Sequence, residues 1–305
     1  IGVDHPDFAM LLVMAKLDHD LDAAIAESSR RLELPRPPAE DLEAAMAWRF
    51  ANSPSDPLTR IVDDTRDWDS LEALAEKAPE VVLAAFWPWF VRLLTAVRTA
   101  NPERDWTPGF PIPYGLDLRF EGERSFGLQE TTLLGALRIA LEQFAQNDPD
   151  AFLNWLDTHE QERANPAQRY FAHTLASLPE RFSSRSLKFL QDDPNRLFLG
   201  NSEDHSSTSK RLIKAASAFW TDDELARFET FLLSYVHPQD PDHIPPPDVR
   251  RMISRLVRRT RLGLLRVLPE KRLSPTSLKV IVEEGRVFEK DHVGVTYSGV
   301  QSIGS

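Results

Sequence analysis

The chain contains no cysteine, few glycines (12 of 305 residues) and no long uninterrupted run of apolar residues. The absence of cysteine excludes disulfides and thiolate zinc sites, and it is typical of a reducing compartment such as the cytoplasm. The scarcity of glycine disfavours a sheet-rich fold with many tight turns, and also a glycine-rich phosphate loop. The most apolar stretch, residues 81–94, is interrupted by Pro88 and Arg92 and is too short to cross a bilayer.

Signatures of catalysis are missing as well. The chain has no GxxxxGK[ST] or GxGxxG loop and no HExxH, and its eight histidines form no pair four residues apart. Two acidic clusters, Asp18–Asp20 and Asp63–Asp69, are best interpreted as a solvated helix junction and as helix caps, and the run Ser206–Ser209 lacks a catalytic partner at a recognisable spacing. We expect no enzyme activity and no cofactor or metal in this chain, although an enzyme assembled from scattered residues stays open.

The 23 prolines recur at intervals and mark the starts of successive short helices. Asp148-Pro149 and Asn165-Pro166 combine a cap residue with a proline, and Thr221 with Glu224 forms a capping box. Short amphipathic helices joined by short proline-containing links are typical of helical repeats. The sequence therefore predicts an all-α fold, an α-solenoid of HEAT/TPR-like helical hairpins.

The organisation along the chain follows from these signals. We predict N-terminal helical repeats in residues 1–100, a proline-rich loop or β arm in 101–125 with a short strand near 110–122, C-terminal helical repeats in 126–290 and an extended tail or strand in 291–305. The first 32 residues are expected to form two helices that meet near Asp20. The expected later helices are Ala39–Ala51, Leu58–Asp64, Asp67–Lys77, Pro79–Ala100, Gly127–Gln146, Pro149–Glu160, Pro166–Leu178, Ser183–Asp192, Ser206–Trp220, Asp222–Val236, Pro247–Leu268 and Ser274–Phe288.

Two local patterns bear on how the repeats are built. In Pro79–Ala100, the aromatic residues 86, 87, 89 and 90 are expected to fill the core beside a bend at Pro88, with an aromatic binding patch as the alternative. The tripeptide Leu-Pro-Glu occurs at 178–180 and again at 268–270, each time followed by serines and an amphipathic segment. This offset of 90 residues matches two repeats of about 45 residues.

Charge is distributed unevenly along the chain. Residues 1–150 carry 27 acidic and 14 basic side chains, whereas the remainder is close to neutral, and the net charge is −11. An acidic first half disfavours nucleic-acid binding there. By contrast, residues 246–272 hold nine basic side chains against Asp248 and Glu270. The predicted partner-binding residues in this segment are Arg251, Arg255, Arg258, Arg259 and Arg266. The alternative interpretation is a solvated helix face, or one that pairs with acidic neighbours in the helix array.

The segment from Phe189 to Gly200, FLQDDPNRLFLG, resembles a motif of very large bacterial P-loop proteins. The later order of Leu268-Pro269-Glu270, Ser274-Pro275, Gly294 and Ser298-Gly299 before Ile303-Gly304-Ser305 is similar too, although the tail departs from the family's pattern. The family is that of STAND/NACHT-like ATPases, which resemble the AVAST-type anti-phage defence proteins. The resemblance covers about residues 148–305 and implies a helical sensor region with its NTPase outside this chain.

These observations lead to one functional hypothesis and two alternatives. We expect a cytoplasmic helical-repeat recognition or sensor scaffold, a segment of a larger bacterial defence NTPase, which binds a protein ligand or neighbouring domains of the same polypeptide. The absence of an initial methionine favours such a segment. The alternatives are a helical-repeat nucleic-acid-binding module that uses the stripe from Arg250 to Arg272, and an unrecognised enzyme.

Overall fold

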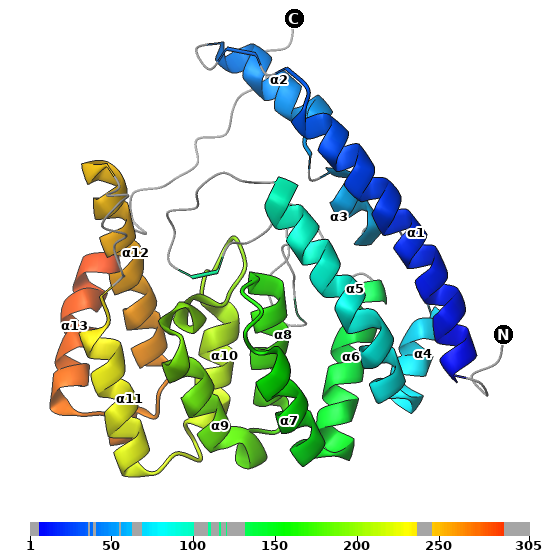
Figure 1. Cartoon of the computed structure of the whole chain (residues 1–305). Coiled ribbons are helices and arrows are strands. Elements are labelled where there is room, and N and C mark those ends of the chain that lie inside the picture. Colours follow the sequence, from blue (N-terminus) through cyan, green and yellow to red (C-terminus); the bar gives the residue numbers. More distant parts are fainter. Residues whose placement is uncertain are drawn as a thin grey trace, which may run out of the picture.

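The computed structural model describes residues 6–35, 37–38, 41–54, 56–62, 69–100, 109–110, 116, 120, 132–236 and 246–289. Over these residues the protein is all-helical, without a β-strand (Figure 1). The all-α prediction is therefore confirmed. The elements are α1 (Pro6–Leu32), α2 (Leu42–Asn52), α3 (Asp56–Val62), α4 (Asp69–Lys77), α5 (Pro79–Ala100), α6 (Thr132–Asn147), α7 (Pro149–His159), α8 (Asn165–Ser177), α9 (Pro179–Asp192), the 3-10 helix η1 (Pro194–Phe198), α10 (Ser207–Ala216), α11 (Asp222–Ser234), α12 (Pro247–Arg266), the 3-10 helix η2 (Glu270–Arg272) and α13 (Pro275–Glu289).

Several helices begin at the signals seen in the sequence. The Asp148 carboxylate accepts a hydrogen bond from the amide of Ala151, and Pro149 is the first residue of α7. At the start of α11, the Thr221 side chain accepts from the amide of Glu224, whose carboxylate accepts from the Thr221 amide. Both arrangements satisfy amides that have no partner within the helix.

The first helix is continuous, so the prediction of two helices meeting near Asp20 is wrong. The charged residues around Asp20 do not break the helix, because Leu17, Leu21 and Ala24 continue one buried stripe through them. Asp18 and Asp22 lie one turn apart on α1, and both pair with Arg92 of α5, at 2.8 and 2.6 Å. The acidic residues near Asp20 thus form ion pairs that join α1 to α5.

The helix Pro79–Ala100 has the predicted bounds and continues through Pro88. Pro88 and Ala84, whose carbonyl loses its helical donor, are both exposed, so water can satisfy that carbonyl. Phe86, Trp87 and Phe90 are buried, as is Trp89, whose indole donates to the Leu17 carbonyl at 3.0 Å. These rings are core, as expected.

Within the described residues, α5 is also the one helix that could cross a membrane by length and composition, and half of its most apolar window is buried inside the protein. Its 22 residues exceed the stretch considered from the sequence. A buried core helix meets the same criteria, so the length of α5 carries no further conclusion.

The helices from α5 to α13 lie side by side in a row, and α1 crosses one end of it (Figure 1). In one layer α6, α8, α10 and α12 contact one another in that order. In the other layer Phe152 of α7 packs on Phe182 of α9, α9 contacts α11, and Glu229 of α11 binds Ser274 and Ser277 at the start of α13. From α6 to α13, each helix therefore packs mainly on helices close to it in the chain.

One hydrophobic core runs through the described residues from Met10 to Leu273. The helices α4 and α5 both pack on α6, so the helices before and after the proline-rich segment share this core. Most of residues 101–131, including the predicted strand, and the tail 291–305 lie outside the described residues. Of the predicted strand region, Phe110, Leu116 and Phe120 are described and buried.

The two Leu-Pro-Glu tripeptides adopt different local structures. At the first, Pro179 opens α9 directly, so the predicted start at Ser183 is wrong. At the second, Glu270 begins a 3-10 turn, and α13 starts at Pro275. The first tripeptide thus belongs mainly to the start of α9, and the second lies in the link between α12 and α13. The prediction that the offset of 90 residues marks two repeats stays a prediction.

Candidate partner-binding surface

The helix α12 is amphipathic. Ile253, Val257, Thr260 and Leu264 are buried on one face, three or four residues apart, where the helix packs on α10, α11 and α13. At 100° per residue, the opposite face carries positions 251, 252, 255, 259 and 266, and the buried Leu262 lies on it between Arg259 and Arg266. The helix therefore buries its apolar stripe and presents a basic one.

The basic outer face consists of four exposed arginines and an exposed methionine. Met252 keeps 52% of its surface accessible and lies among the guanidinium groups. From the first arginine to the last the face spans about 22 Å, because an α-helix rises about 1.5 Å per residue. We call this set the α12 outer face: Arg251, Met252, Arg255, Arg259 and Arg266.

Two of these arginines have no partner on another helix within the described residues. The Arg251 Nε donates only to the carbonyl of Pro247, one turn back in its own helix, at 3.3 Å. Arg259 is exposed and pairs with no described residue. In contrast, Arg255 lies 5.9 Å from the ring of Phe288, and both it and Arg266 take part in contacts within the protein.

The fifth predicted residue, Arg258, belongs to a different surface. Its Nη2 lies 2.8 Å from Glu284 Oε2 of α13, and its Nε lies 3.1 Å from both carboxylate oxygens. Its guanidinium also lies 5.8 Å from the ring of Phe288. The ion pair of Arg258 with Glu284 thus stabilises the packing of α13 on α12. The sequence placed it with the other four, because its spacing alone does not show where α13 packs.

Other basic residues of the same segment also point inward. Arg261 donates to the carbonyl of Leu233 at 3.4 Å, and Arg272 donates to the carbonyl of Trp220 at 2.6 Å while pairing with Asp222 at 2.8 Å. Arg261 thus binds a carbonyl in the last turn of α11, where the helix dipole favours a cation, and Arg272 binds the link between α10 and α11. The exposed basic surface of α12 is therefore smaller than the nine basic residues of this segment suggest.

A second polar site, which sequence reasoning missed, lies where α7 and α9 end and α8 begins. The buried Arg196 donates to the carbonyls of Glu160 and Phe189, both at 2.9 Å, and to the amide oxygen of Gln168 at 2.8 Å. Beside it is a cavity of about 570 Å³ with Arg163 and Asp193 on its wall. Both basic and acidic side chains line this cavity. The N–H groups of Arg196 are already bound to the carbonyls of Glu160 and Phe189 and to the Gln168 side chain.

This network gives the FLQDDPNRLFLG motif a structural explanation. Asp193 caps η1 by accepting from the Asn195 amide, and Pro194 is the first residue of that turn. Arg196 then donates hydrogen bonds to carbonyls at the C-terminal ends of α7 and α9, and Leu197 is buried in the core. The sequence showed an arginine directly before the apolar run Leu197–Leu199, but the carbonyls that this arginine binds belong to residues outside that run.

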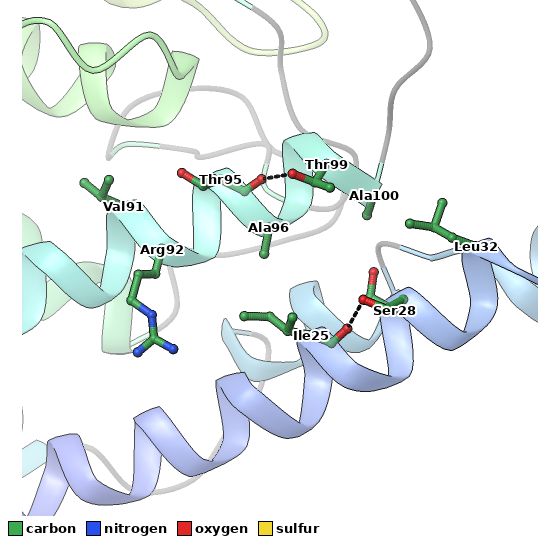
Figure 2. Close-up of a pocket in the computed structure, with 10 residues that line it drawn as sticks. Ile25, Ser28, Leu32, Val91, Arg92, Thr95, Ala96, Thr99 and Ala100 are labelled. Carbon is green, nitrogen blue, oxygen red and sulfur yellow. Dashed lines mark hydrogen bonds between the residues drawn. The ribbon is translucent and has the colours of Figure 1, made fainter.

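A third feature is a shallow apolar groove of about 340 Å³ between α1 and α5 (Figure 2). Ile25 and Leu32 of α1 and Ala96 and Ala100 of α5 line it. The hydroxyls of Ser29 and Thr99 donate to carbonyls of their own helices, both at 2.9 Å. The groove therefore presents mostly carbon to solvent.

Among the described residues no group of three or more His, Asp or Glu side chains could hold a metal ion. Asp18 is bound to Arg92, and most of the Asp63–Asp69 cluster lies outside the described residues. His173 pairs with Glu142 at 2.6 Å, but the pair is covered by the ring of Phe120, stacked on the imidazole at 4.4 Å. Neither residue faces a described pocket.

Comparison of the chain with protein-family models, with curated proteins and with solved structures finds no match. The resemblance to STAND/NACHT-like ATPases therefore stays a prediction from the residues quoted above.

Proposed function

We propose that this chain is a helical-repeat recognition scaffold that binds a protein ligand through the α12 outer face. The observation that carries the proposal is the exposure of Arg251 and Arg259, which face solvent without a partner on another described helix. Guanidinium groups form charge-assisted, often bidentate, bonds to carboxylates, and arginine is enriched in protein interfaces.

We propose that these helices form an α-solenoid, an arrangement that suits a scaffold role. The helices that open successive hairpins, α6, α8, α10 and α12, start 33, 42 and 40 residues apart, which lies near the lengths of TPR and HEAT repeats. Packing between neighbours in two layers is how such repeats bury their apolar faces. We further propose a cytoplasmic sensor segment of a bacterial defence NTPase, a hypothesis that depends on the family resemblance alone.

A site-specific cross-linking experiment tests the binding role. A photoreactive amino acid replaces Met252 on the α12 outer face, and a matched variant carries it at Arg227, an exposed position of α11. In cells that produce the protein, we expect one protein to cross-link at position 252 and not at 227, and to be lost from Arg251→Glu/Arg259→Glu. Cross-links to nucleic acid at 252 would favour the nucleic-acid-binding alternative, and equal cross-linking at both positions would reject the surface.

A further inference from the structure

We propose that the α12 outer face binds an acidic α-helix whose carboxylates recur every four residues and which carries an apolar side chain for Met252. This inference rests on the function proposed above and specifies the chemistry of the partner. It depends on the spacing and mixed character of the face and not on its charge alone.

The spacing favours a helical partner. Arg251, Arg255 and Arg259 follow each other at intervals of four residues, which places successive side chains about 6 Å apart along the axis. Glutamates four residues apart on a partner helix repeat at the same rise. Two helices packed side by side can thus bring carboxylates to Arg251 and Arg259, which lie two turns apart, about 12 Å along the axis. These are the two arginines without a partner on another described helix.

The local composition supports this class of partner. Met252 is 52% exposed at the N-terminal end of the charged face, between Arg251 and Arg255 in the sequence, and Leu256 one turn on is half-buried. Methionine is flexible and packs against irregular apolar surfaces. A partner that offers only charge would leave this patch in water, whereas an amphipathic acidic helix covers it and surrounds it with ion pairs.

The overall charge disfavours a nucleic acid at the same place. The chain carries −11, and residues 1–150 contribute 27 acidic against 14 basic side chains. Within the basic segment, Arg258, Arg261 and Arg272 bind other helices or helix ends, so they add little to phosphate binding. Non-specific nucleic-acid binding depends on many phosphate contacts, and this face offers few.

The test measures the binding of a fluorescent 18-residue helical peptide to the full chain by anisotropy. The peptide has glutamates at i, i+4, i+8 and i+12 and two leucines beside them. A control peptide has the same composition with the glutamates distributed around the helix. We expect the control to bind at least 10-fold more weakly, because it cannot bring its carboxylates to one side.

Variants then locate the contact. Arg251→Glu/Arg259→Glu is expected to weaken peptide binding at least 30-fold, and Arg251→Ala/Arg259→Ala about 10-fold. The matched control, Lys214→Glu/Arg227→Glu, makes the same change in net charge at exposed positions of α10 and α11 and should change binding less than 2-fold. The alanine variant keeps the test valid if the glutamate variant folds poorly.

The contrary outcomes are distinct. Equal binding of both peptides, or an equal effect of both glutamate variants, overturns the inference in favour of diffuse attraction. An 18-base-pair DNA duplex that binds more tightly than the peptide, with a steep salt dependence, overturns it in favour of nucleic acid. If the peptide does not bind but a protein still cross-links specifically at position 252, the acidic-helix inference fails while the proposed function stands.

Discussion

At the residue scale, Gly200 marks the tightest approach of the backbone to itself. A Cβ at this position would lie 1.9 Å from the carbonyl oxygen of Asp204 and 2.4 Å from the amide nitrogen of Ser206. The loop cannot move away easily, since the Asn201 side chain accepts from the amides of Glu203 and Asp204. A single methyl group at position 200 would therefore force the loop apart.

The first prediction compares two glycine-to-alanine substitutions. Gly200→Ala should lower the free energy of unfolding by about 2–3 kcal/mol, because it overpacks a fixed backbone. Gly263→Ala, inside α12, meets only the flexible Lys210 side chain at 2.7 Å and gains helix propensity, so its change should stay within about 1 kcal/mol. Urea unfolding of both variants is the measurement, and equal losses would contradict the assignment of the clash to the loop.

The pair of His173 and Glu142 couples stability to pH. Burial lowers the pKa of His173 below its usual value of 6.5, a shift that the hydrogen bond to Glu142 opposes and the charges of Arg211 and Arg138 reinforce. Burial would raise the pKa of Glu142, but its hydrogen bond to His173 and the positive charges beside it hold that pKa below 4.5. The folded protein therefore keeps the imidazole neutral and the carboxylate charged.

Both shifts predict a loss of stability in acid. As the pH falls below 6.5, the unfolded chain takes up a proton at His173 that the folded protein resists, and below 4.5 the same holds for Glu142. We expect the melting temperature to fall between pH 7 and pH 5, and His173→Gln to flatten this part of the profile. His19→Gln, at an exposed position of α1, is the control. An unchanged profile in His173→Gln would show that another group is responsible.

At the scale of single elements, α12 carries adjacent arginines with different roles. Arg258 is bound to Glu284, whose side chain is only 15% exposed, whereas Arg259 faces solvent. The two residues are neighbours in one helix, so exchanging either for glutamate changes net charge and helix propensity equally. Any difference between the variants reports on the α12–α13 contact.

Arg258→Glu should therefore lower the free energy of unfolding by about 1–2 kcal/mol, because it places a second carboxylate against Glu284. Arg259→Glu should change it by less than about 0.5 kcal/mol, as is usual for surface substitutions. Thermal unfolding of the two variants gives the comparison. A loss at Arg259 as large as that at Arg258 would mean that the whole stripe stabilises the helix row.

At the scale of the whole molecule, Trp87 connects helices from both sides of the proline-rich segment. Its ring lies 5.1 Å from that of Trp155 in α7 and 5.1 Å from that of Phe171 in α8. Together with the packing of α4 and α5 on α6, this makes the described helices depend on one shared core.

Trp87→Ala should accordingly cost about 3–5 kcal/mol, as for other buried tryptophans. Because the cavity would lie between α5, α7 and α8, helices on both sides of the proline-rich segment should lose amide protection together in hydrogen exchange. Protection lost only within α5 and its N-terminal neighbours would instead indicate that the two parts fold independently.

The sequence by itself determined the helical class and many helix starts, because capping and proline effects act within one turn. Thr221 with Glu224, Asp148 with Pro149 and the bounds of α5 are such local features. Where a start was wrong, as for α9, the chain offered two nearby signals, Pro179 and the serines after it.

Only the tertiary structure decided which polar residues bind one another. Arg196 binds carbonyls at the ends of two helices, and Glu229 accepts from Ser274, 45 residues away. It also separated Arg258, held by α13, from Arg259, which remains available to a partner. Such pairings depend on how helices pack and on the burial of their side chains, and neither is encoded in the spacing of charges along a single helix.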